Sequence, residues 1–129
     1  MTEPIVLPPG ESRAYELSPM RGVFKADGPE TSDRYCVSEW TVEPGHPGPG
    51  PHHHEANDEI FLVTEGTMTF LLGDEWIEAA TGTFLRIPAG VTHDFENRSD
   101  QPATAFNVFI PGGFEAPFRA WTESGPSSA

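Results

Sequence analysis

The sequence predicts an all-β fold, an antiparallel sandwich or barrel built from short strands. Its 129 residues include 14 Pro and 13 Gly, which are spread as punctuation between short apolar runs. This spacing excludes long helices over most of the chain and favours strands bounded by turn formers. Several apolar runs are also separated by sequences suited to tight hairpin turns. We expect a single domain over residues 1–129, with a core barrel from about residue 20 to residue 112.

The clearest strands form two successive hairpins in the middle of the chain. We expect strands at Glu59–Thr64, Thr67–Leu72 and Glu75–Ala79, joined by turns at Glu65-Gly66 and Gly73-Asp74. Gly-Asp suits a two-residue turn because glycine adopts a positive φ without steric cost. Turn formers also bound five further runs, which gives about eight strands in all. These five are Gly22–Ala26, Tyr35–Val42, Thr83–Ile87, Thr92–Asn97 and Ala103–Ile110.

Two segments are expected to lie outside the strands. Residues 43–51, rich in Pro and Gly, should form an extended loop, because proline removes backbone donors. A linker between domains is the competing interpretation, but the 42 residues before it are few for an independent domain. After Gly113, the residues Phe114, Phe118 and Trp121 share one side at helical spacing. We therefore expect a short helix at 113–122 over one end of the barrel and a flexible tail at 123–129.

Charge and cysteine content restrict the possible partners and location. The formal charge of -13, from 20 acidic residues against 7 Lys plus Arg, repels nucleic acid and anionic membranes. The lone Cys36 cannot form an intrachain disulfide, and the first twenty residues lack the pattern of a secretion signal. No run approaches the roughly 18 apolar residues of a membrane helix. We expect a cytoplasmic protein that binds neither nucleic acid nor membrane.

Two segments bring metal-binding side chains into the predicted sheet: His52, His53, His54 and Glu59 in one, and His93 in the other. Because strand side chains alternate faces, His52 and His54 should point the same way, about 6.5 to 7 Å apart at Cα, which a metal about 2.1 Å from each nitrogen can span. His53 then points away. The same alternation puts Glu59 on the wrong face unless the chain bends after His54, for which Asn57-Asp58 is suitable.

The second segment is a cleaner strand. One face of Thr92–Asn97 carries His93, Phe95 and Asn97, whereas Asp94 and Glu96 should face water. Three imidazoles and one carboxylate are the ligands that a borderline first-row metal prefers. A structural histidine in the core is the alternative, and a purification tag is disfavoured because the cluster lies mid-chain. Glu59 is a candidate ligand or, alternatively, an outer partner or general base. His46, in the flexible loop, and His53 are not expected to bind.

At these residues the sequence resembles the cupin superfamily. Its second motif, G-x5-P-x-G-x2-H-x3-N, is matched without departure. Its first, G-x5-H-x-H-x3,4-E-x6-G, departs only in the leading Gly45, which is separated from His52 by six residues rather than five. The surroundings of both motifs are similar to those of small single-domain cupins of the quercetin 2,3-dioxygenase type. The residues that match are Gly82, Pro88, Gly90, His93 and Asn97 in the second motif, and His52, His54, Glu59 and Gly66 in the first.

The resemblance implies a cupin jelly roll with a metal inside one end and, often, a homodimer joined through exchanged N-terminal strands. By position, His52, His54, Glu59 and His93 match the family's ligands. This set leaves one or two positions open for water, substrate or O₂, and it permits one Fe, Mn, Ni, Co, Cu or Zn ion per chain.

We predict a metal-dependent enzyme acting on a small aromatic or enolisable molecule, most simply a quercetinase-like dioxygenase in which Glu59 shuttles a proton. A non-redox cyclase or isomerase that uses the same metal as a Lewis acid, and a non-catalytic small-molecule-binding module, are the alternatives. Candidates for lining the substrate pocket, each as compatible with a plain core role, are Phe61, Phe70, Phe95 and Phe106.

Overall fold

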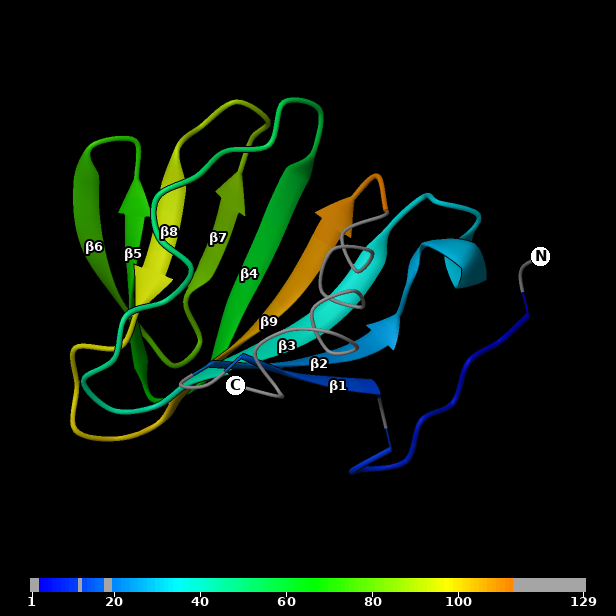
Figure 1. Cartoon of the computed structure of the whole chain (residues 1–129), viewed down its shortest axis with the longest axis horizontal. Helices are drawn as coiled ribbons and strands as arrows, with labels where there is room; N and C mark the ends of the chain where they lie inside the picture. The colour runs from blue at the N-terminus through cyan, green and yellow to red at the C-terminus, as the bar shows by residue number, and fades with distance from the viewer. Residues whose placement is uncertain (1–2, 12, 18–19, 113–129) are drawn as a thin grey trace.

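Two antiparallel sheets make up the computed structural model, which describes residues 3–11, 13–17 and 20–112 (Figure 1). The six-stranded sheet has the order β1-β2-β3-β9-β4-β7, and the three-stranded sheet has the order β6-β5-β8. The predicted all-β fold is confirmed. The predicted helix at 113–122 and tail at 123–129 lie outside the described residues.

Each of the predicted strands is present, with ends displaced by two residues at most. One further strand, β1, and a short 3-10 helix at Gly28–Thr31 were not predicted. The larger sheet consists of β1 (Arg13–Leu17), β2 (Met20–Ala26), β3 (Cys36–Val42), β9 (Ala103–Ile110), β4 (Asp58–Glu65) and β7 (Phe84–Ile87). The smaller sheet consists of β6 (Glu75–Ala80), β5 (Thr67–Leu72) and β8 (His93–Glu96).

Glycines at the two predicted hairpin turns have the backbone conformation that the turns need. Gly73 has a φ of 70° and lies between Leu72 and Glu75, which pair across β5 and β6. Gly66 has a φ of 68°, and a Cβ added there would lie 2.3 Å from the carbonyl oxygen of Pro102. Only glycine therefore fits the β4–β5 turn without strain or collision.

The hydrophobic core lies between the two sheets. Alternate residues of β3 are buried and half-buried, as expected for a sheet with one face on the core. Three buried rings from both sheets meet there: Phe61 of β4, Phe70 of β5 and Phe95 of β8, with ring centroids 5.2 to 6.0 Å apart. This aromatic cluster joins the strands that carry Glu59 and His93, so it fixes the spacing between the two halves of the candidate site.

Phe106 does not belong to this cluster, which corrects its prediction as a pocket residue. It pairs with Leu62 of β4, whose side chain is 38% exposed, and both lie on the outer face of the larger sheet. The inner face of β9 instead carries Ala103 and Ala105, both fully buried. Trp40 is the β3 partner of Ala105, and its indole lies over Gly22 of β2, where an added Cβ would stand 2.6 Å from the ring.

Candidate metal centre

The segment that carries the first histidines lies along the free edge of β8. In Figure 1 the trace between β3 and β4 crosses β8, where His52 and His93 form an isolated antiparallel bridge. The His52 amide donates to the His93 carbonyl at 2.9 Å, and the His93 amide donates to the His52 carbonyl at 2.7 Å. The expectation that His52 and His54 lie in a regular strand is wrong, because only this one bridge forms. The bridge nevertheless ties the two histidine segments together.

The chain bends between His54 and Glu59, as predicted, but the bend lies at Glu55 and Ala56 rather than at Asn57-Asp58. Asn57 and Asp58 instead anchor the start of β4. The Asn57 side chain donates to the Pro111 carbonyl at 2.9 Å, and the Asp58 carboxylate accepts the Ala89 amide at 2.9 Å. With β4 anchored in this register, Glu59 points inward and is only 2% exposed.

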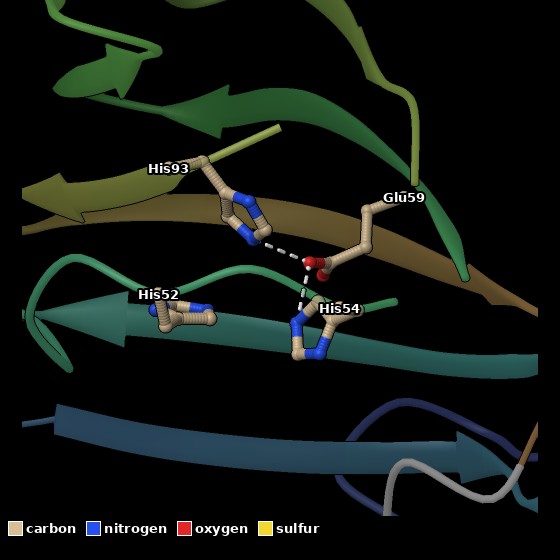
Figure 2. A group of neighbouring side chains, drawn as sticks. All are labelled: His52, His54, Glu59 and His93. Atoms are coloured by element: carbon tan, nitrogen blue, oxygen red, sulfur yellow. Dashed lines mark hydrogen bonds and ion pairs between the residues drawn. The ribbon is translucent and has the colours of Figure 1, made fainter. Parts of the chain in front are cut away.

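The four predicted ligands converge. Each of His52, His54, Glu59 and His93 offers one donor atom, and all four donor atoms lie within 4.8 Å of one another. Figure 2 shows the Glu59 carboxylate between two imidazoles. Its Oε2 lies 2.7 Å from His93 Nε2 and 3.1 Å from His54 Nε2. His93 comes from β8 in the smaller sheet, and Glu59 comes from β4 in the larger sheet.

Backbone carbonyls orient two of the rings. His52 Nδ1 lies 2.7 Å from the Gly50 carbonyl, and His93 Nδ1 lies 2.9 Å from the Val91 carbonyl. A carbonyl can only accept, so each Nδ1 carries the hydrogen. That leaves each Nε2 as the atom that faces the cluster, which is the tautomer and orientation that outer-shell hydrogen bonds impose on metal-binding histidines.

The spacing of the donors fits a first-row metal ion. An ion about 2.1 Å from each ligand places neighbouring donors roughly 3.0 to 3.4 Å apart, depending on its coordination geometry. The Oε2–Nε2 distances of 2.7 and 3.1 Å are close to that separation. The donor chemistry also fits, because three imidazoles with one carboxylate suit most divalent metals of this row. The cluster could therefore hold one such ion.

The charges of the cluster are strongly coupled in the absence of metal. Burial alone would raise the pKa of Glu59, but its hydrogen bonds with His54 and His93 lower it to about 2. Burial would likewise lower the pKa of His93, but the Glu59 hydrogen bond and the Val91 carbonyl raise it. For His52, burial and the neighbouring imidazoles lower the pKa. A proton on His93 thus supplies the positive charge that the carboxylate needs, and a cation would replace it.

The other two histidines lie away from the cluster. His53 is exposed and pairs with Glu55 at 2.8 Å, so its side chain points away as predicted. His46 is exposed in the loop, and its backbone carbonyl accepts the Asn97 amide at 3.0 Å.

Asp94 corrects the expectation that the acids of β8 face water. It is 5% exposed, and its Oδ1 accepts the amides of Gly50 at 3.1 Å and Phe95 at 2.8 Å. Burial raises its pKa, although both amides oppose that effect. Because the Gly50 carbonyl in turn accepts from His52, Asp94 holds the loop that orients a candidate ligand.

Sequence reasoning missed the amide that holds the carboxylate. Asn107 of β9 is fully buried and donates its Nδ2 to Glu59 Oε1 at 3.0 Å. A signal for it was present, because Asn107 shares its parity with Ala103, Ala105 and Phe109 on the inner face of β9. A polar residue in an otherwise apolar inward series needs a polar partner.

A separate cavity of about 580 Å³ lies between the N-terminal segment and the region of the 3-10 helix. Lys25 and Arg34 line it, and none of the four candidate ligands does. The geometry of the donors, rather than the size of this cavity, identifies the candidate site. Among the described residues, no helix has the length and apolar character needed to cross a bilayer.

Comparison with solved structures gives the same fold. A protein from Thermotoga maritima described as a predicted oxalate decarboxylase superposes with a TM-score of 0.77 at 17% identity, over 83% of this chain and 99% of that one. KdgF from Halomonas sp. superposes with a TM-score of 0.72 at 18% identity, over 83% of this chain and 93% of that one. At these identities the likeness shows the fold alone.

A third structure is more similar in sequence. The polyketide cyclase RemF from Streptomyces resistomycificus superposes with a TM-score of 0.68 at 25% identity, over 78% of this chain and 74% of that one. A comparison with curated protein sequences found no match.

The cupin domain model matches residues 38–109, which include both histidine segments and Glu59. This match covers more than half of the chain, and its span begins in β3 and ends in β9. The chain therefore belongs to the cupin domain family.

Proposed function

We propose that this cupin is a metal-dependent enzyme that acts on a small aromatic or enolisable molecule. The observation that carries the proposal is the convergence of four donor atoms from His52, His54, Glu59 and His93 within 4.8 Å. Four protein ligands on an ion that accepts five or six leave positions for substrate. The donor set suits one divalent Fe, Ni, Mn, Co, Cu or Zn ion per chain.

A divalent ion bound there would favour ionisation of a substrate enol or phenol and stabilise the oxygen anion that results. The protein's own contribution centres on Glu59. Asn107 donates to its Oε1, whereas Oε2 faces the imidazoles and is the oxygen best placed to bind a cation or to exchange a proton with substrate. The ring of Phe109 packs edge-on against the ring of His54, with the two centroids 4.9 Å apart, and so places an apolar surface beside the cluster. Such a wall limits the access of water and suits an apolar substrate.

Two reactions fit this site. The first is the quercetinase-like dioxygenation predicted from the sequence, with O₂ as co-substrate. The second is a non-redox cyclisation or isomerisation, and the 25% identity to the polyketide cyclase RemF favours it. Both begin with proton removal from an enolisable substrate, and in both Glu59 is the base or a ligand.

Metal-free protein, reloaded with each of the six metals in turn, separates these reactions. O₂ uptake with a flavonol supports the dioxygenase, whereas an absorbance change of an enolisable polyketide-like substrate without O₂ uptake supports the cyclase or isomerase. His53→Ala is the matched control, because it removes a neighbouring imidazole that points away from the cluster. Tight binding of these compounds with no turnover by any metal form would reject the enzyme and favour a binding module.

We also propose that residues 1–129 form one domain, that Phe61, Phe70 and Phe95 back the substrate pocket, and that the protein is a cytoplasmic homodimer. The aromatic cluster supports the second of these, because it lies between the strands that carry Glu59 and His93. The proposal of a dimer rests on the resemblance to cupins. The proposal of a cytoplasmic location rests on the lone cysteine and the acidic charge. Sedimentation equilibrium tests the dimer, and a monomer at micromolar concentration would contradict it.

A further inference from the structure

A chain of buried hydrogen bonds reaches Glu59 from the far side of the cluster. Asn107 Nδ2 donates to Glu59 Oε1 at 3.0 Å and also to the Ile60 carbonyl at 3.3 Å. Ser38 Oγ donates to Asn107 Oδ1 at 3.3 Å, and Trp40 Nε1 donates to Ser38 Oγ at 3.0 Å. Trp40, Ser38, Asn107 and Glu59 are each at most 3% exposed. These four side chains form a polar relay across the inner face of β3, β9 and β4.

The indole at the start of this relay sets its direction. An indole N–H can donate but cannot accept, so Ser38 Oγ accepts from Trp40 and turns its own hydrogen toward Asn107. Asn107 therefore presents its carbonyl oxygen to Ser38 and its amide hydrogens to Glu59. At the end of the relay, Glu59 Oε1 accepts from Asn107, and Oε2 faces the imidazoles of His54 and His93.

We propose that Trp40, Ser38 and Asn107 are positioning residues that give the two oxygens of Glu59 different roles. Oε1 is a fixed acceptor for Asn107, and Oε2 is the oxygen presented to a cation, to the two imidazoles and to any transferred proton. Without the relay, the carboxylate is free to rotate and to present either oxygen, or both. This proposal rests on the proposed metal-dependent function, and it assigns roles to residues that lie outside the ligand set.

Two variants break the relay at different points. Asn107→Ala removes the direct partner of Glu59, and Ser38→Ala removes a single oxygen atom one step earlier. Ser38→Ala decides the question if Asn107→Ala does not fold. Thr41→Val is the matched control: Thr41 Oγ1 lies 2.9 Å from Thr104 Oγ1, a hydrogen bond between the same strands, β3 and β9, on the opposite face of the sheet.

The first readout is Co²⁺ binding to the metal-free protein, followed by visible absorption, which reports the coordination of the ion. Loss of an outer-shell partner of a ligand typically weakens metal binding by about 10- to 100-fold, so we expect a loss of this size for Asn107→Ala and about threefold or more for Ser38→Ala. Both variants should also shift the visible bands, because the carboxylate can then bind through either oxygen. Thr41→Val should match the wild type in affinity and spectrum. Wild-type affinity and spectrum in both relay variants would overturn the proposal.

The second readout needs no metal and separates this proposal from the proposed function. The indole N–H resonance of Trp40, assigned with Trp40→Phe, should move in Glu59→Gln, and that response should disappear when Ser38→Ala is added. If the wild type binds no Co²⁺ but the resonance responds in this way, the proposed function fails and the relay stands. If the chemical shift of the Trp40 indole N–H is the same in Glu59→Gln as in the wild type, the relay is rejected, whatever the result of the Co²⁺ titration.

Discussion

Replacing Glu59 with Gln removes a buried negative charge while keeping the shape of the side chain. Gln can still accept from Asn107 at Oε1, so the substitution isolates the charge that faces His54 and His93. The fall of the Glu59 pKa from 4.5 to about 2 corresponds to roughly 3 kcal/mol in favour of the charged form. In the metal-free protein, that energy comes from the hydrogen bonds of Glu59 with His54 and His93, and the second of these also raises the pKa of His93.

The sign of the effect fixes a pH window. Because the folded-state pKa of Glu59 lies below its unfolded value, its contribution to stability is present above about pH 4.5 and is lost as the pH falls toward 2. Because the folded-state pKa of His93 lies above 6.5, its contribution is complete below pH 6.5 and is lost as the pH rises through the folded-state value. The charge pair therefore stabilises the metal-free fold most between about pH 4.5 and 6.5.

Urea unfolding of both proteins in the presence of a chelator, from pH 4.5 to pH 8, measures this window. We expect the wild type to exceed Glu59→Gln in unfolding free energy by up to about 3 kcal/mol near pH 6 and by clearly less at pH 8. His53→Ala, which removes an exposed imidazole, should show no such dependence. An advantage of the wild type that stays constant or grows toward pH 8 would refute the reasoning.

Three further predictions concern the candidate site and the loop that packs on β8. His93→Ala should lower the metal content below one ion per chain and remove the stabilisation by metal, which is about 2.7 kcal/mol when free metal is 100 times its Kd. Elemental analysis and thermal unfolding with and without metal measure both effects. Unchanged metal content would contradict the assignment of His93 as a ligand. His53→Ala should leave both quantities at wild-type values, since its ring pairs with Glu55, and a large loss would count against the cluster as described. In Gly48→Ala the new Cβ would meet the Phe95 carbonyl oxygen at 1.9 Å. The substitution should lower the free energy of unfolding, measured in urea, by roughly 1 to 3 kcal/mol. Wild-type stability of the variant would show that the loop is not in close contact with β8 at Gly48.

Turn chemistry made most of the fold predictable. Gly66 and Gly73 mark turns that only a positive φ allows, and the apolar runs beside them have the length of strands. The strand β1 was missed, since it is an edge strand that pairs only with β2 and lies outside the part of the chain with clear turn signals. The four candidate ligands were predictable because their residue types are rare in a core and their spacing matches a motif.

The direction of side chains was harder to predict in a strand whose more apolar face is not the face buried in the core. In β9, Phe106, Val108 and Ile110 are the bulkier apolar set, yet they lie on the outer face, and the inner face carries two alanines, Asn107 and Phe109. Other strands supply the bulky interior side chains instead, because the buried rings of Trp40, Phe61 and Phe95 come from β3, β4 and β8. Such compensation between strands is a property of packing that a single strand pattern does not contain.

The donors of the candidate site come from two different layers, Glu59 from the larger sheet and His93 from the smaller one. A bound ion would therefore act as a cross-link between the two sheets. Amide hydrogens of the short strand β8, which lies at the edge of its sheet, should then exchange with solvent more slowly in the metal-loaded protein. Loss of the ion would loosen the contact between the two sheets at the candidate site, which couples metal supply to the rigidity of β8.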